Sequence, residues 1–183
     1  MEVLQTPVFA EWFAALRDRR ARSKIAGRIA RFELGLLGDV KSVGDGVLEA
    51  RVDFGPGYRL YFVRRGDRLI VLLVGGDKSS QPRDIEAGMT IELTRFDAAE
   101  ALTQAEDQAE LLADAFATGD VHVITQAIGI VARAHGMTEL AKATGMKRQQ
   151  LYRMLGPEGN PTLGSMLKLL PALGLRMRIE AAA

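Results

Sequence analysis

The chain has 183 residues, which is enough for one ordinary domain or two small ones. Its composition, 48% hydrophobic and 26% charged, is that of a folded protein, and the absence of cysteine excludes disulfides and thiolate metal sites. The longest strongly apolar stretch, residues 69–74, is too short to span a membrane, and no signal peptide is visible, so we expect a cytoplasmic protein with no membrane partner.

Charge is unevenly distributed along the chain. Residues 1–88 carry 15 Lys and Arg against 12 Asp and Glu, residues 89–120 carry one Arg against eight acids, and residues 121–183 carry eight Lys and Arg against three acids. Two basic segments around an acidic one are typical of two modules that face polyanions. Ordinary solvated charge is the alternative interpretation.

Residues 1–88 predict a small α+β domain. A short strand at 3–5 precedes a helix that Thr6 caps and Pro7 begins, and a second helix is expected over 20–36. From residue 47 the apolar period changes to two, which predicts strands at 47–54, 58–63 and 69–74, joined by turns. Helices followed by such a meander favour an α+β fold with an antiparallel sheet.

From Gly88-Met89 the pattern becomes helical only, so residues 89–183 predict an all-α second domain. Acidic helices are expected over about 94–118, with capping-box spacing at Thr94 and again at Thr103. Further helices should begin at residues 120, 138 and 162, where an Asp or Thr can cap them, and a helix-turn-helix is expected over about 138–155.

Several kinds of site are excluded by spacing. Lys78-Ser79 after a strand suggests a phosphate-binding loop, but Asp77 and Leu72 occupy the positions where that motif needs glycine. The two histidines, His122 and His135, do not have metal-ligand spacing. We therefore expect no metal and no cofactor, and any acid–base chemistry in the first domain must use Lys, Arg, Tyr, Asp or Glu.

The strands of the first domain carry an unusual polar set. Arg51 lies on the polar face of its strand, Arg59 and Tyr61 share one face of the next, and Lys78 follows the third. Two guanidiniums, a phenol and an ammonium are suited to hold a phosphodiester and to stabilise the charge of its transition state. The alternative is that the tyrosines, including Tyr58, pack on the sheet and the arginines are solvated.

The segment MTELAKATGMKRQQLYRML has the spacing of a helix-turn-helix. Leu140 and Ala141 should face inward, Gly145 lies in the turn, and Leu151 and Met154 are the buried positions of the second helix. This arrangement leaves a set of polar side chains to meet DNA bases and phosphates: Lys147, Arg148, Gln149, Tyr152 and Arg153. Any helical hairpin can imitate this pattern.

The segment ARVDFGPGYRLYFVRRGDRLIVLLVGGDKSSQPRDIEAG resembles the core of HigB-type toxins of the RelE/ParE superfamily, and the likeness extends over nearly all of residues 1–88. ELTRFDAAEAL and the helix-turn-helix segment are similar to the HigA-type antitoxin of the same systems, over residues 90–180. The resemblance implies a RelE/ParE-like toxin domain followed by an antitoxin domain.

The resemblance also implies a function. The toxin would be an endoribonuclease that cuts mRNA in the ribosome with the ribose 2′-hydroxyl as nucleophile and without a metal. Carried over by position, the catalytic residues would be Arg51, Arg59, Tyr61 and Lys78, with Lys41 and Tyr58 as RNA-binding residues. Arg59 and Lys78 would meet the phosphate charge, Arg51 would position the substrate, and Tyr61 would stack or transfer a proton.

The antitoxin half would neutralise the toxin and bind operator DNA as a homodimer, which represses its own operon. The two chains of such systems are continuous here, so we expect the toxin to be inactive in the intact fusion, through contact within one chain or exchanged between chains. Two alternatives stay open: a DNA-binding regulator without nuclease activity, and a gyrase inhibitor like the ParE branch.

Overall fold

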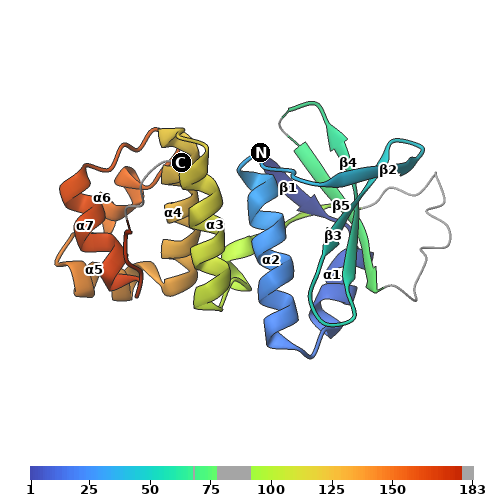
Figure 1. Cartoon of the computed structure of the whole chain (residues 1–183), viewed down its shortest axis with the longest axis horizontal. Helices are drawn as coiled ribbons and strands as arrows, with labels where there is room; N and C mark the ends of the chain where they lie inside the picture. Colours follow the sequence, from blue (N-terminus) through green and yellow to red (C-terminus); the bar gives the residue numbers. More distant parts are fainter. Residues whose placement is uncertain (68, 78–91, 179–183) are drawn as a thin grey trace. The chain divides into compact units, whose positions relative to one another are not determined.

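The computed structural model describes residues 1–67, 69–77 and 92–178, and the chain divides into two compact units (Figure 1). The first unit is Met1–Leu102 and the second is Thr103–Ala183. The expected domain boundary at residues 88 and 89 lies outside the described residues. Lys78 and the side chain of Asp77 also lie outside them.

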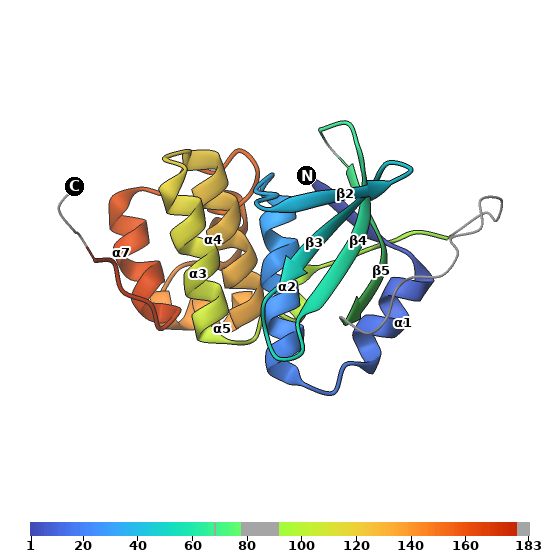
Figure 2. The same ribbon diagram turned by 45° about the vertical axis from the view of Figure 1, so that its right-hand side comes forward.

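The first unit contains a six-stranded sheet with strand order β2-β3-β4-β5-β1-β6. Figure 2 shows β2, β3, β4 and β5 of this sheet. In chain order the unit's elements are β1 (Glu2–Gln5), α1 (Pro7–Ala15), α2 (Arg19–Glu33), β2 (Val40–Gly44), β3 (Val47–Val52), β4 (Tyr58–Arg65), β5 (Leu69–Asp77), β6 (Thr94–Arg95) and the 3-10 turn η1 (Ala98–Glu100).

Both helices of this unit begin where local chemistry favours it. Thr6 accepts a hydrogen bond from the backbone N–H of Phe9 at 3.2 Å, and Pro7 occupies the first turn of α1, as predicted. Asp18 accepts from the backbone N–H of Arg20 at 2.8 Å and so caps α2. Apolar residues at helical spacing such as Phe9 of α1 and Ile25 of α2 are fully buried.

The sheet is mixed, whereas the sequence led us to expect antiparallel pairing alone. β3, β4 and β5 are antiparallel neighbours, but β1 lies parallel to β5. β2 adds a further strand beside β3. Its exposed, polar sequence VKSVG has no apolar alternation that would have revealed it.

The helices α1 and α2 pack on one face of the sheet. Phe32 of α2 lies against Phe62 of β4, with ring centroids 4.8 Å apart. Trp12 of α1 lies so close to Gly75 of β5 that an added Cβ would come within 2.1 Å of its ring. Glycine at residue 75 therefore allows the helix to approach the sheet, and the opposite face of the sheet carries the polar residues of β3 and β4.

The second unit is helical, with α3 (Ala105–Ala117), α4 (Val121–His135), α5 (Met137–Thr144), α6 (Arg148–Met154) and α7 (Leu163–Ala172). Asp120 caps α4 and Thr162 caps α7, as predicted. Thr138 is expected to cap the next helix, but α5 begins at Met137 and its N-cap position is Gly136, which has a φ of 99° and also ends α4. Gly145 takes the left-handed φ of 70° between α5 and α6.

The helix expected from Thr94 is not formed. Thr94 and Arg95 form β6, which pairs antiparallel with β1, and Asp97 caps the short turn η1 rather than an acidic helix. The expected acidic helix starts only at Ala105, after Gln104. Pairing with a strand from the far end of the sequence overrides the local capping signal here.

Candidate functional site

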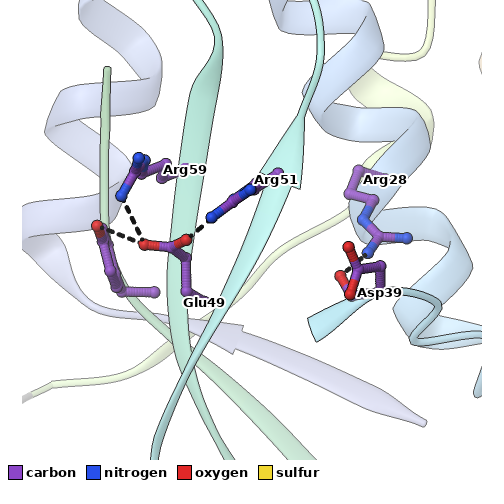
Figure 3. Close-up of polar contacts among 6 residues, drawn as sticks. Arg28, Asp39, Glu49, Arg51 and Arg59 are labelled. Carbon is purple, nitrogen blue, oxygen red and sulfur yellow. Dashed lines mark hydrogen bonds and ion pairs between the residues drawn. The ribbon is translucent and has the colours of Figure 1, made fainter. Parts of the chain in front are cut away.

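A cluster of four polar side chains lies on the sheet face opposite the helices, and we call it the Glu49 cluster: Glu49, Arg51, Arg59 and Tyr61. The register of β3 and β4 places Glu49 opposite Tyr61 and Arg51 opposite Arg59. Because directly opposed residues point to the same face, the four side chains converge (Figure 3).

The buried carboxylate of Glu49 is the centre of this cluster. Its side chain is only 5% exposed, and it accepts hydrogen bonds from the Tyr61 hydroxyl at 3.0 Å, from Arg59 at 3.0 Å and from the Arg51 Nε at 3.3 Å (Figure 3). Arg51 is 57% exposed and Arg59 31% exposed, so each guanidinium keeps a surface toward solvent. The cluster thus has a buried anion with cations above it.

The surroundings shift the pKa values of the cluster in opposite directions. Burial raises the pKa of Glu49, but hydrogen bonds from Tyr61 and Arg51 and the charge of Arg59 outweigh burial, so the net pKa is lowered. Burial and the neighbouring carboxylate raise the pKa of the Tyr61 phenol. At neutral pH the cluster therefore holds an ionised carboxylate, a protonated phenol and two cations.

Beside the cluster lies an open pocket of about 150 Å³. It is lined by Arg51, Asp53, Gly57, Tyr58 and Arg59. Two guanidiniums at such an opening can bind a phosphate diester with bidentate hydrogen bonds. The Tyr61 phenol is not part of this lining, but it is connected to the pocket through Glu49, which accepts from both Tyr61 and Arg59.

The predicted residues of the first unit differ in how close they lie to the cluster. Lys41 of β2 pairs with Glu49 in the register and is exposed, so it lies on the same face. Tyr58 lines the pocket, but its ring lies edge-on to Trp12, with centroids 6.3 Å apart, on the helix side of the sheet. Lys78 lies outside the described residues.

The sequence analysis did not single out Glu49. The apolar alternation of residues 47–54 does place Glu49 on the polar face with Arg51. What reveals its importance is the pairing with Tyr61, and this depends on the register between two strands. The signal that could have identified Glu49 is an acidic residue that shares a sheet face with predicted catalytic residues of its own strand and of the next strand.

A second basic surface lies on α6, and all five residues predicted to contact DNA are exposed there: Lys147, Arg148, Gln149, Tyr152 and Arg153. Lys147, Gln149 and Arg153 line a shallow hollow of about 330 Å³ together with Gln150. The Arg148 guanidinium lies 5.4 Å from the centroid of the Tyr152 ring and donates to its hydroxyl at 3.2 Å. Leu140 and Leu151 are buried beneath this surface.

Residues 92–181 match a family described as "Probable addiction module antidote protein". This match covers slightly less than half of the chain. An antidote-type role in a toxin–antitoxin module follows for this part of the chain, and an antidote implies a toxin as its partner.

Two relatives, both uncharacterized proteins of Haemophilus influenzae, are similar to parts of the chain. One is 44% identical over 86 residues, which are 47% of this chain and 87% of the relative. The other is 35% identical over 92 residues, which are 50% of this chain and 95% of the relative. No solved structure matches the chain significantly. Each of these two relatives is thus roughly half as long as this chain.

Two features are absent from the residues that the structure describes. No three His, Asp or Glu side chains gather there as a metal site would require. No helix in that part of the chain has the length and apolar character needed to cross a membrane.

Proposed function

We propose that this chain is a fused toxin–antitoxin protein whose first unit is a latent, ribosome-dependent mRNA endoribonuclease. The observation that carries the proposal is the Glu49 cluster, in which two cations and a protonated phenol surround a buried carboxylate on an open sheet face. The antidote family of residues 92–181 supports a toxin as the function of the unit that precedes them. A RelE/ParE-like fold remains the expected assignment of this unit.

The chemistry that suits the cluster is transfer of an RNA phosphodiester to its own 2′-hydroxyl. The 2′ oxygen forms a bond to phosphorus, the bond to the 5′ oxygen breaks, and the products are a 2′,3′-cyclic phosphate and a free 5′-hydroxyl. One proton must leave the 2′ oxygen and one must reach the 5′ oxygen. Arg59 and Arg51 can bind the non-bridging oxygens and stabilise the extra charge of the transition state.

The two remaining members of the cluster can handle these protons. A bound diester competes with Glu49 for the guanidiniums of Arg51 and Arg59, and this frees carboxylate oxygens to accept the 2′ proton. The phenol of Tyr61, whose pKa is raised, stays protonated and can donate to the leaving 5′ oxygen. Lys78 and Lys41 remain predicted phosphate and RNA contacts.

We propose that the second unit neutralises the first and also binds operator DNA as a homodimer. The exposed residues of α6 support this proposal, because their cations and amides can contact phosphates and base edges. The buried Leu140 and Leu151 and the left-handed Gly145 between α5 and α6 support a helix-turn-helix as the arrangement of these two helices.

The test compares three chains expressed in bacteria: residues 1–88, residues 1–102 and the full chain. We expect one or both of the shorter chains to arrest growth and to create new 5′-hydroxyl ends within translated mRNA, while the full chain does neither. The chain that ends at residue 102 is included because the compact first unit extends to Leu102. Arg59→Ala should remove both effects.

The alternatives give different results in the same experiment. DNA breaks in place of new mRNA ends would indicate a gyrase inhibitor. If both short chains are harmless and leave mRNA intact, while the full chain binds a palindromic site upstream of its gene, the protein is a regulator without nuclease activity.

A further inference from the structure

Residues 92–102 belong to the antidote family by sequence but to the first unit by packing. The family match begins at residue 92, whereas the compact first unit ends at Leu102. A segment that belongs to one module by sequence and is buried in the other has the position of a binding segment. The contacts of residues 92–102 show how this binding is made.

The first contact is strand addition. Arg95 pairs with Leu4 and Thr94 with Gln5, so β6 extends the sheet beyond β1. The backbone N–H of Phe96 then donates to the carbonyl oxygen of Val3 at 3.0 Å. Without this segment, β1 would be an edge strand with unpaired backbone groups, which is a surface that recognises extended peptides.

The second contact is an aromatic anchor. The Phe96 side chain is only 5% exposed, and its ring lies edge-on to Phe13 and Phe9 of α1, with centroids 5.3 Å and 6.0 Å away. A buried aromatic residue in a pocket of aromatic rings is the arrangement that usually dominates a binding energy.

The third contact is the turn that follows. Asp97 accepts a hydrogen bond from the backbone N–H of Ala99 at 3.1 Å and so fixes the turn η1, which packs against α2. Ala98 and Leu102 are completely buried. Strand, aromatic anchor and capped turn thus occupy consecutive parts of one surface, formed by β1, α1 and α2.

We propose that residues 92–102 are a docking peptide through which the antidote domain binds the first unit, and that this surface accepts the peptide from a separate chain as well as from the same one. The family match includes the segment, so a family member that lacks a first unit has no sheet of its own for the segment to join. The two relatives, each roughly half as long as this chain, are candidates for proteins in which the two modules are separate chains.

This interaction does not depend on the proposed RNA chemistry. In the strand order, β5 and β1 separate β6 from β4, so the docking peptide does not cover the Glu49 cluster. Binding of the peptide can therefore be measured without any measurement of nuclease activity, and failure of one proposal leaves the other intact.

The experiment uses the full chain with a specific protease site inserted between Gly88 and Met89. After cleavage we expect the two pieces to co-elute in size-exclusion chromatography at about 1 µM. Phe96→Asp should raise their dissociation constant at least about 100-fold, because it places a charge in the aromatic pocket. Phe116→Asp is the matched control, since Phe116 is an exposed aromatic residue of the antidote piece outside the docking peptide, and should change the constant less than about 3-fold.

A synthetic peptide of residues 92–102 provides a second measurement that does not depend on how the variant chain folds. Added in excess, it should displace the antidote piece from the cleaved protein, whereas the same peptide with Phe96→Asp should not. Pieces that separate in the cleaved parent protein would overturn the proposal. A Phe96→Asp protein that stays associated, or a peptide that displaces nothing, would overturn it too.

Discussion

The Glu49 cluster and the α6 surface are both basic, but their charges are arranged differently. On the sheet, Arg51 and Arg59 already share a buried carboxylate, which also holds the Tyr61 hydroxyl. On α6, Lys147 and Arg153 point to solvent around a shallow hollow, and no ion pair to either is found among the described residues.

This difference indicates two kinds of binding. Cations fixed by a buried anion are preorganised, so they lose little conformational freedom when a diester replaces that anion. Small changes in the geometry of such a cluster should therefore have large effects on the rate of a reaction. Cations on an open helix surface attract a polyanion through its counterions, so their effects should be moderate, additive and strongly dependent on salt. Substitutions in the two regions should therefore differ in the size of their effect and in its dependence on salt.

The largest effect is expected for Arg59→Ala. Arg59 lines the pocket and makes the shorter of the two arginine contacts to Glu49, at 3.0 Å, so its removal should lower mRNA cleavage by the toxin-active chain about 100- to 1000-fold. The measurement is the rate at which new 5′-hydroxyl ends appear in a translation reaction. Arg64→Ala is the control, since Arg64 lies on the same strand but pairs with the exposed Asp67, and it should change the rate less than about 3-fold.

A cluster with another role would give another result. If the rate is unchanged in Arg59→Ala, the Glu49 cluster is a structural ion pair and the reactive groups lie elsewhere on the first unit.

A smaller effect is expected on α6. Arg153→Ala should weaken binding of the full chain to its operator about 10-fold at physiological salt and lower the slope of log affinity against log salt by about one. Lys168→Ala on α7 is the matched control, because Lys168 is exposed in the same unit but lies outside the hollow. Equal losses in both variants would mean that binding is unspecific attraction to the whole unit.

Much of this structure follows from signals within a few residues. Thr6-Pro7, Asp120 and Thr162 mark helix starts because their side chains cap or begin the very turn that follows them. Strict alternation is enough to place Arg59 and Tyr61 on one strand face.

Features that depend on distant pairing could not be predicted in this way. β6 carries a capping-box signal, yet it becomes a strand because β1, about ninety residues earlier, offers an unpaired edge. Glu49 contacts Tyr61 because of the register of β3 with β4, and residue alternation alone does not determine that register. The sequence therefore predicts which residues share a face more readily than it predicts which residues touch.

A change in stability is expected for Glu49→Gln. The folded-state pKa of Glu49 lies below its usual value of 4.5, so the ionised carboxylate contributes stability that is complete above about pH 4.5 and is lost as the pH falls through the lowered pKa. We expect the variant to lose about 1–2 kcal/mol of unfolding free energy at pH 7, since hydrogen bonds to a charged group weaken while the half-exposed arginines stay solvated.

Fluorescence of Trp12, the single tryptophan, reports unfolding of the first unit in urea at pH 7, 5, 4 and 3. The gap between the parent protein and Glu49→Gln should shrink steadily below pH 4.5. A gap that stays constant down to pH 3 would contradict the assignment of an ionised, hydrogen-bonded carboxylate.

The smallest effect is expected for Glu139→Ala on α5. Glu139 also has a lowered pKa, here because Lys142 donates to it at 2.8 Å, but both side chains are largely exposed, at 65% and 69%. Water solvates each charge almost as well when the other is absent, so the melting temperature should not change measurably. Thermal unfolding followed by circular dichroism checks this, and a clear loss of stability would show that exposed pairs of the second unit act like the buried Glu49. Glu49 and Glu139 thus provide the sharpest contrast between the units. The pKa of each is lowered, but only the ionisation of the buried Glu49 should be linked to folding.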